Sequence, residues 1–241
     1  MIKPNGKVFK KAIYGEYQWQ TYGEIHSKVK KFAAGLSELG VERVAIYMET
    51  RADWIIAAQA CWRHNITIVT VYATLGEQAV ADALTEAKIE WIISSSALVE
   101  AKLAPVLAKG VQLKGIIHAP HENQAQKLRF KVPDNTETKT YSYDDIYQLG
   151  NDSLKAPPPM PKPETISLVM YTSGTSGKAK GVLISQANMV AAISGIGERI
   201  QTLVRFTPAG LLPFLYSTVT LSVTKNNFRY LYCFLTTCTH S

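Results

Sequence analysis

Short apolar runs rich in β-branched residues alternate with helical patterns along most of this chain, and that alternation limits the possible folds more than any other feature. Runs of this length, with apolar residues at nearly every position, are typical of strands that are buried on both faces. We therefore expect an α/β fold in which a parallel sheet is flanked by helices. The expected strands are residues 44–48, 66–72, 91–93, 115–118 and 166–170, and the expected helices between them are residues 52–62, 75–87 and 97–109.

The first helix is expected to begin after Thr21. Glu24 lies three residues further on, which is the spacing of a capping box. Gly40 is a natural stop, because glycine readily adopts the left-handed conformation that ends many helices. The apolar residues in between fall on one helical face: Tyr22, Ile25, Val29, Phe32, Leu36 and Leu39.

The composition fits a globular intracellular protein. The 241 residues suffice for one sizeable domain or two small ones, and 46% of them are hydrophobic. The net charge of +7 fits an anionic cofactor, an acidic membrane surface or nucleic acid. No long Lys/Arg block appears, so we expect no nucleic-acid surface. Three cysteines make no disulfide framework, and the N-terminus lacks the apolar core of a signal peptide.

No metal site is expected from the His and Cys residues. His118 and His121 are three residues apart, but no further ligand is close to them in the sequence. The sequence gives only a weak signal for zinc in Cys233, Cys238 and His240, because no second segment with ligand spacing accompanies them. We expect the histidines to have structural or surface roles.

Residues 171–182, Tyr-Thr-Ser-Gly-Thr-Ser-Gly-Lys-Ala-Lys-Gly-Val, carry the strongest functional signal. The glycines allow backbone N–H groups to approach an anion closely, and hydroxyls and lysines add donors and positive charge. The stretch is not a Walker A loop, because only two residues separate Gly174 from Gly177. It therefore favours binding of a polyphosphate. The alternative is a flexible Gly/Ser loop that binds nothing.

This stretch resembles the phosphate loop of the adenylate-forming enzymes, whose pattern is Tyr/Phe-Thr-Ser-Gly-Ser/Thr-Thr-Gly-x-Pro-Lys-Gly-Val. The sequence matches that pattern at residues 171–175, Gly177 and residues 180–182. It differs at Ser176, where the family has Thr, and at Ala179, where the family has Pro. Ser176 keeps the hydroxyl, whereas Ala179 loses the fixed φ angle of proline.

Three further segments are similar to the long-chain branch of the acyl-CoA synthetases within that superfamily. They are residues 51–54, 58–61 and 71–76, and they precede the loop in the family's order. Trp54, Trp62 and Tyr72 in or beside these segments are expected to be core residues rather than the lining of a lipid tunnel.

The resemblance implies a long-chain fatty acid–CoA ligase, which joins a fatty acid to CoA through acyl-AMP and uses ATP, Mg²⁺ and CoA. It implies that Lys180 neutralises the departing pyrophosphate and that Lys178, at a variable position, is solvated. The residues implied to cradle the β- and γ-phosphates are Thr172, Ser173, Gly174, Thr175, Ser176 and Gly177.

The family's later motifs are not found in this sequence, so no catalytic residue is assigned. We expect residues 1–201 to be an incomplete N-terminal part of the large domain of an adenylate-forming enzyme, with a Pro-rich linker at 151–165. Residues 202–241 contain no Asp or Glu, and residues 206–223 are uncharged over a length near the minimum for a membrane span. Pro208 and Pro213 weaken that reading. The hypothesis is that this tail is not family sequence.

Two other classes of function stay open. The chain can be a non-catalytic fragment that binds a nucleotide or a partner, and the expectation is that the 241 residues alone do not make acyl-CoA. It can also be part of an adenylating ligase for another carboxylic acid. The long-chain branch further implies an intracellular location, with the endoplasmic reticulum or another membrane surface as a partner.

Overall fold

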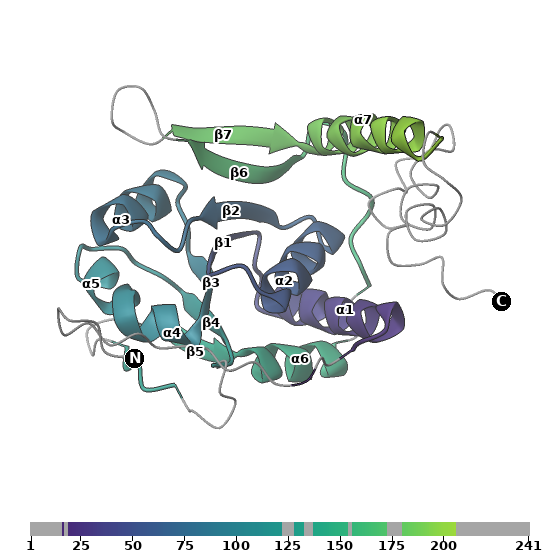
Figure 1. The fold of residues 1–241 in the computed structure, drawn as a ribbon. Helices are drawn as coiled ribbons and strands as arrows, with labels where there is room; N and C mark the ends of the chain where they lie inside the picture. Colours follow the sequence, from purple (N-terminus) through teal and green to yellow (C-terminus); the bar gives the residue numbers. More distant parts are fainter. Residues whose placement is uncertain are drawn as a thin grey trace, which may run out of the picture.

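The computed structural model describes residue 16 and residues 19–121, 128–132, 137–153, 156–172 and 180–205. Helices and strands alternate through these residues (Figure 1). In chain order the elements are α1 (Tyr22–Glu38), β1 (Arg43–Tyr47), α2 (Ala52–Arg63), β2 (Thr67–Val71), α3 (Glu77–Glu86), β3 (Trp91–Ser95), α4 (Ser96–Leu98), the π-helix η1 (Val99–Leu103), α5 (Ala104–Leu107), β4 (Gly115–Ala119), β5 (Lys139–Ser142), α6 (Tyr143–Asp152), β6 (Ile166–Thr172), β7 (Lys180–Ser185) and α7 (Gln186–Arg205).

The described strands form one sheet in the order β5-β4-β3-β1-β2-β6-β7. Every neighbouring pair is parallel except β6 and β7, which are antiparallel. The predicted parallel sheet flanked by helices is therefore confirmed. Two strands were not predicted: β5 lies in a segment interpreted only as polar and turn-forming, and β7 directly follows the predicted phosphate loop.

Helices cover both faces of the sheet (Figure 1). Along β1, Val44 and Ile46 pack with buried residues of α1, α2 and α6, whereas Ala45 and Tyr47 pack with those of α3, η1 and α5. Successive side chains of a strand point to opposite faces, so one continuous apolar run supplies both cores. This is why the strands of this chain read as unbroken hydrophobic segments.

Helix α1 begins and ends as predicted. The Thr21 hydroxyl accepts a hydrogen bond from the backbone N–H of Glu24 at 3.2 Å, and the Glu24 carboxylate accepts one from the backbone N–H of Thr21 at 2.6 Å. Gly40 has a φ of +67°, the left-handed value expected after a helix. Val29, Phe32 and Leu36 are buried, but Tyr22 is 61% exposed and does not belong to the core.

Two glycines allow α1 and α6 to cross with their backbones in contact. A Cβ atom at Gly35 would lie 2.1 Å from the carbonyl oxygen of Ile146, and one at Gly150 would lie 1.8 Å from that of Lys31. Both distances are far below any contact that a real side chain tolerates. The crossing therefore requires glycine on each helix.

The single helix expected at residues 97–109 is divided into three segments. The short α4 is followed by the wide π turn of η1, and Pro105 stands in the first turn of α5. Proline has no N–H to donate to the preceding turn, so a regular α-helical hydrogen-bond ladder cannot pass through this position. The wider turn before Pro105 accommodates that missing donor.

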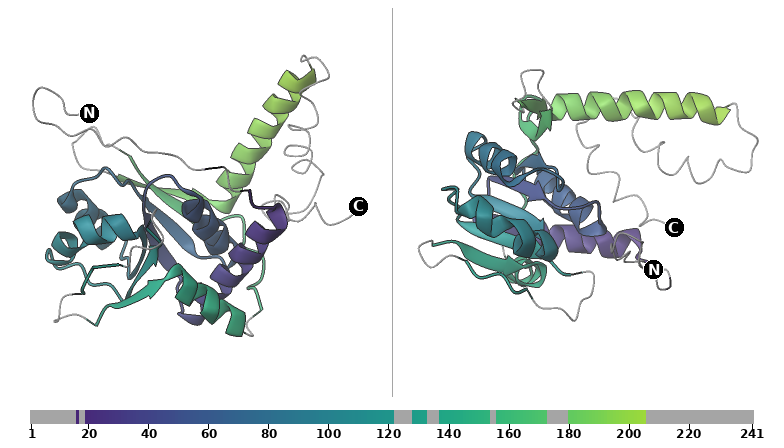
Figure 2. Two further views of the ribbon diagram at one scale, coloured as in Figure 1. Left: turned by 60° about the horizontal axis from the view of Figure 1, so that its bottom comes forward. Right: turned by 60° about the vertical axis from the view of Figure 1, so that its left-hand side comes forward.

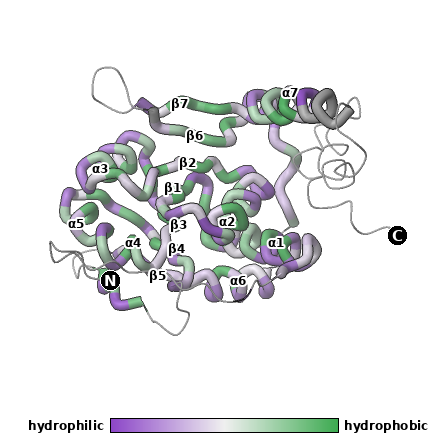
Figure 3. Tube along the Cα trace, in the orientation of Figure 1, coloured by the Kyte–Doolittle hydropathy of each residue, from purple (hydrophilic) through white to green (hydrophobic). Residues whose placement is uncertain are grey.

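At the β7 end of the sheet the chain departs from the compact layers. Helix α7 projects away from the sheet in both views of Figure 2. Much of β6 and β7 is coloured as hydrophobic in Figure 3, yet Val182 and Leu183 of β7 are 46% and 63% exposed. Helix α7 continues across the 201/202 boundary to Arg205.

The Pro-rich linker predicted at 151–165 is described over residues 151–153 and 156–165. Its first two residues are the end of α6 and not part of a linker, whereas residues 156–165 contain no helix or strand. It is attached to the end of α2, since the Asn65 side-chain amide donates a hydrogen bond of 2.8 Å to the carbonyl of Pro159. In the described part of the chain, no helix has the length and apolar character needed to cross a bilayer. Residues 206–241, which include the uncharged run, Cys233, Cys238 and His240, lie outside the described residues.

Candidate functional site

The predicted phosphate loop connects β6 to β7 at the carboxyl edge of the sheet. Strand β6 runs parallel to β2, so the loop leaves the sheet at the edge where β1, β2, β3 and β4 also end. Thr172 is the last residue of β6 and Lys180 the first of β7, and the two are paired directly across the hairpin. Crevices outside the carboxyl ends of parallel strands are where ligands bind in open α/β sheets.

The structure describes only the two ends of that loop. Lys180 has an exposed side chain at the start of β7. The other predicted phosphate-binding residues lie outside the described residues: Ser173, Gly174, Thr175, Ser176 and Gly177. Their contacts with a phosphate stay a prediction from the sequence.

The base of the hairpin is fixed to α3. The hydroxyl of Tyr171 donates a hydrogen bond of 3.1 Å to the carbonyl of Ala83. Tyr171 is buried, and burial, followed by the negative charge of Glu86, raises the pKa of its hydroxyl. Tyr171, the first residue of the motif, is thus an uncharged core residue that attaches β6 to α3.

Gly181 belongs to the same packing. It is paired with Tyr171, and a Cβ atom at this position would lie 3.2 Å from Cγ1 of Val169 and 3.5 Å from the Tyr171 ring. The distance to Val169 is tighter than an ordinary carbon contact, so that side chain would have to shift slightly, whereas the distance to the Tyr171 ring is an ordinary contact. A glycine after Lys180 therefore avoids a tight contact with Val169.

The loops that follow β1 and β4 are joined at the same edge. Arg51 donates from Nη2 to the carbonyl of Pro120 at 3.0 Å and from Nε to the Asp53 carboxylate at 2.6 Å. The Arg51 and Asp53 side chains are both about one-fifth exposed, at 21% and 22%. In the sequence these two residues stand out only as part of segment 51–54, which resembles the family. Their position directly after a predicted strand was the signal that they lie at the edge.

A serine–histidine pair lies between β3 and β4. The Ser96 hydroxyl donates to the carbonyl of Ala119 at 2.7 Å, and Oγ of Ser96 lies 3.0 Å from Nδ1 of His118. Because the hydroxyl proton is used at Ala119, we assign the proton of the second contact to Nδ1 of His118. Burial lowers the pKa of His118. Ser96 is itself buried, so the pair has the structural role that the sequence predicts for His118.

His121 also has a structural partner. Its Nε2 lies 3.2 Å from Oε1 of Glu100, and the same carboxylate oxygen accepts a hydrogen bond of 2.6 Å from the backbone N–H of Arg129. That backbone hydrogen bond, with the His121 contact, lowers the pKa of Glu100. Among the described residues there is no group of three or more His, Cys, Asp or Glu side chains that can hold a metal ion.

Tyr72 is not the core residue that the sequence predicts. It is 53% exposed, directly after β2 and one strand away from the β6 terminus. Trp54 and Trp62 do pack against the core as expected. Tyr72 is the last residue of the apolar run, but strand β2 ends one residue earlier, at Val71. The run alone did not show where the strand ends.

Comparison with protein families gives a match over nearly the whole chain. The family of AMP-binding enzymes matches residues 4–231. Long chain acyl-CoA synthetase 8 of Arabidopsis thaliana is 35% identical over 80% of this chain, and fatty acyl-CoA synthetase A of Dictyostelium discoideum is 29% identical over 83% of it. The matched regions are 27% and 28% of these relatives, so this chain spans little more than a quarter of their length.

Solved structures show the same fold. The adenylation domain of a carboxylate reductase from Mycobacterium chelonae superposes with a TM-score of 0.64 at 20% identity, over 80% of this chain and 31% of that one. The A domain of the carboxylic acid reductase from Segniliparus rugosus, solved with AMP and a co-purified carboxylic acid, gives a TM-score of 0.60 at 17% identity, over 71% of this chain and 29% of that one.

Proposed function

This chain belongs to the AMP-binding enzyme family, and we propose from that premise that it forms the triphosphate-binding part of a long-chain fatty acid–CoA ligase. The observation that carries the proposal is the position of the Gly/Ser/Thr stretch at the carboxyl edge of a parallel sheet, between Thr172 and Lys180. The names of the relatives, which are acyl-CoA synthetases, support the substrate class.

The proposed reaction has two steps. In the first, a carboxylate oxygen of the fatty acid attacks the α-phosphorus of ATP, the bond to the β-phosphate oxygen breaks, and pyrophosphate leaves with the electron pair. In the second, the thiolate sulfur of CoA attacks the acyl carbon and AMP leaves. ATP and CoA are both substrates in this proposal.

The main obstacle to the first step is electrostatic, because an anion must approach a polyanion. Backbone N–H groups and hydroxyls that converge on the phosphates lower that barrier without reorganising during the reaction. We assign this role to the N–H groups around Gly174 and Gly177 and to the hydroxyls of Thr172, Ser173, Thr175 and Ser176.

Lys180 is proposed to neutralise charge on the departing pyrophosphate. Its ammonium is exposed at the mouth of the hairpin, opposite Thr172, while the next residue, Gly181, is packed against Tyr171. A flexible side chain on a fixed backbone suits this task, since the charge can follow a leaving group.

Mg²⁺ enters the proposal only as the ion that accompanies ATP. The described residues contain no set of carboxylates or imidazoles suited to hold a metal, so no step is assigned to a metal held by this part of the chain.

The full two-step reaction is proposed for a protein of the length of the relatives, since the matched regions cover only 27% and 28% of them. For the 241 residues alone we propose ATP binding without acyl-CoA formation, with residues 1–201 as the partial domain and 202–241 as the atypical tail.

We also propose an intracellular location at the endoplasmic reticulum or another membrane surface. One relative is named as a peroxisomal synthetase.

The substrate class is tested with a protein of the relatives' length that contains this chain, by measuring pyrophosphate release from ATP with palmitate, benzoate or an amino acid as the acid. We expect release to depend on palmitate. Release that depends on benzoate or the amino acid instead would overturn the fatty-acid assignment and support an adenylating ligase for another acid. Acyl-CoA formation by the purified 241-residue chain would overturn the proposal that this part does not act alone.

A further inference from the structure

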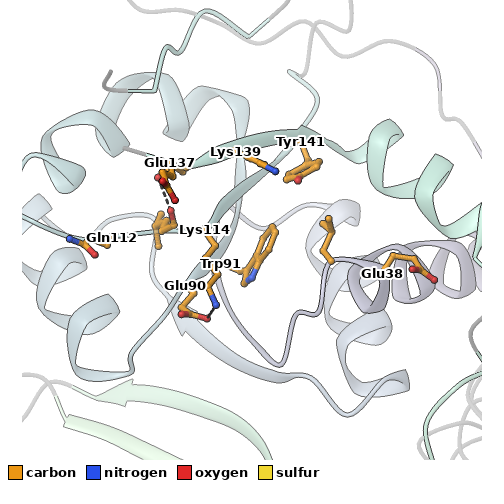
Figure 4. Close-up of a pocket in the computed structure, with 11 residues that line it drawn as sticks. Glu38, Glu90, Trp91, Gln112, Lys114, Glu137, Lys139 and Tyr141 are labelled. Atoms are coloured by element: carbon orange, nitrogen blue, oxygen red, sulfur yellow. Dashed lines mark hydrogen bonds and ion pairs between the residues drawn. The ribbon is translucent and has the colours of Figure 1, made fainter. Parts of the chain in front are cut away.

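A pocket of about 770 Å³ lies at the amino-terminal edge of the sheet, between the starts of β3, β4 and β5 and the end of α1 (Figure 4). It is far from the predicted phosphate loop, because the two lie at opposite ends of parallel strands. It therefore plays no part in the proposed ATP site. Its volume is within the usual range for small-molecule sites, about 300–1,000 Å³.

The walls of the pocket are held by backbone hydrogen bonds. The N–H of Lys114 donates to the carbonyl of Glu90 at 2.7 Å, and the N–H of Lys139 donates to that of Lys114 at 3.0 Å. The Thr138 hydroxyl donates to the carbonyl of Leu113 at 2.7 Å. These bonds fix the three segments that carry the lining side chains, so the pocket is formed before any ligand binds.

An aromatic pair forms the apolar part of the lining. The rings of Trp91 and Tyr141 are 6.0 Å apart between centroids and inclined by 38°. Trp91 is held flat against β4, since a Cβ atom at Gly115 would lie 2.2 Å from its ring. Trp91 is only 7% exposed and lines the pocket together with Tyr141 and Leu39, which are half-buried.

The charged side chains around this apolar part differ in whether they are already paired. Glu90 and Lys114 form an ion pair at 2.8 Å, and Glu38 accepts a hydrogen bond of 2.6 Å from the Ser153 hydroxyl. Glu137 and Lys139 have no ion pair with any described residue, and both are exposed. They stand two residues apart at the start of β5. Within the described residues, two opposite charges thus stand without an ion-pair partner beside an aromatic surface.

We propose that this pocket binds a small zwitterion with an apolar body, the chemistry that a free aromatic amino acid presents. Lys139 takes the anionic group and Glu137 the ammonium group, while the apolar body lies against Tyr141 and Leu39. A ligand with one charge gains from one of these side chains and is repelled by the other. A ligand with both charges gains from both, and the aromatic ring of Tyr141 adds apolar contact.

The test is a calorimetric titration of the full 241-residue chain with L-phenylalanine, phenethylamine and 3-phenylpropionate. These share one ring and differ in carrying both charges, only the cation or only the anion. We expect saturable binding of L-phenylalanine, with each analogue about tenfold weaker, as expected for loss of one charge contact of about 1.4 kcal/mol.

Two variants test the assigned residues. Glu137→Gln and Lys139→Gln are each expected to weaken L-phenylalanine binding about tenfold, and the controls Glu164→Gln and Lys109→Gln, at exposed sites outside the pocket, are expected to leave it unchanged. All four positions are on the surface, so equal thermal midpoints will show that the fold is intact. Absence of L-phenylalanine binding, equal binding of either analogue, or binding unaffected by the two pocket variants would overturn the proposal.

Discussion

The hydroxyl of Tyr171 donates a hydrogen bond of 3.1 Å to the backbone carbonyl of Ala83, which ties the strand that leads into the predicted phosphate loop to helix α3. The Ala83 carbonyl also accepts a helical hydrogen bond of 3.1 Å from the N–H of Ala87. Tyr171→Phe therefore removes one buried hydrogen bond and leaves its acceptor with a partner. We expect a loss of about 1 kcal/mol in the free energy of unfolding, measured by urea denaturation.

Tyr72→Phe is the matched control for that experiment. Tyr72 is 53% exposed and lies outside the buried core. We expect a change within about 0.5 kcal/mol, as for surface substitutions away from special features. Equal effects of the two substitutions would mean that the Tyr171 hydroxyl does not anchor the hairpin.

The crossing of α1 and α6 predicts a strong effect of small substitutions. Gly35→Ala and Gly150→Ala each place a methyl group about 2 Å from a carbonyl oxygen of the other helix, at 2.1 and 1.8 Å. The helices must separate, and we expect each substitution to lower the free energy of unfolding by about 1–3 kcal/mol or more. Thermal unfolding followed by circular dichroism will measure it.

Gly23→Ala gives the opposite expectation in the same helix. A Cβ atom at Gly23 would meet nothing closer than 3.9 Å. Alanine is a better helix former than glycine, so this variant should gain about 0.5–1 kcal/mol. If Gly35→Ala were as well tolerated as Gly23→Ala, the close crossing would be wrong.

Three partly buried histidines predict a loss of stability in mild acid. Burial lowers the pKa values of His26, His64 and His118, so the folded protein binds protons at these sites less readily than the unfolded chain. The stability is fully present above the unfolded pKa of about 6.5 and is lost as the pH falls through the lowered folded values. Thermal midpoints measured from pH 8 to 5 should decline below about pH 6.5.

The variant His118→Gln should flatten part of that decline, because it removes one titrating group. Glu100 titrates in a separate window: its lowered pKa adds stability above the unfolded value of about 4.3, which is lost only in stronger acid. A thermal midpoint that rises between pH 7 and 5.5 would contradict the burial of these imidazoles.

Cys61 should be unreactive in the folded protein. It is fully buried, and burial raises the pKa of its thiol well above the usual range. The thiolate is the reactive species, so iodoacetamide should label Cys61 only after denaturation. Peptide mass spectrometry of native and denatured samples measures this, and rapid labelling of Cys61 in the native protein would contradict the packing of α2.

Much of the fold was predictable because strands buried on both faces leave unbroken apolar runs. The five predicted runs became β1 to β4 and β6, and the capping box at Thr21 and Glu24 fixed the start of α1. Strand β5 was missed because it is short and partly exposed at the sheet edge, where no apolar pattern is required. Strand β7 was missed because residues 180–182 were assigned to the phosphate loop, and because its largely exposed side chains give no buried apolar run.

The sequence shows which segment forms the candidate site, but not the contacts that hold that segment in the fold. Residue types around Gly174 and Gly177 predict a polyphosphate loop, and the structure sets its ends, Thr172 and Lys180, at the carboxyl edge of the sheet. The contacts that support this edge are long-range, such as Tyr171 with Ala83 and Arg51 with Pro120. No local pattern in a sequence encodes partners separated by many residues, so these could not be predicted.

The central claim is that the hairpin between β6 and β7 binds triphosphate, and the most direct measurement is a calorimetric titration of the purified 241-residue chain with ATP and Mg²⁺. We predict saturable binding at one site, weakened about tenfold or more in Lys180→Ala because a charge-assisted contact is lost. The neighbouring variant Lys178→Ala should bind as the unmodified chain does. Absence of ATP binding, or an affinity that Lys180→Ala leaves unchanged, would contradict the account.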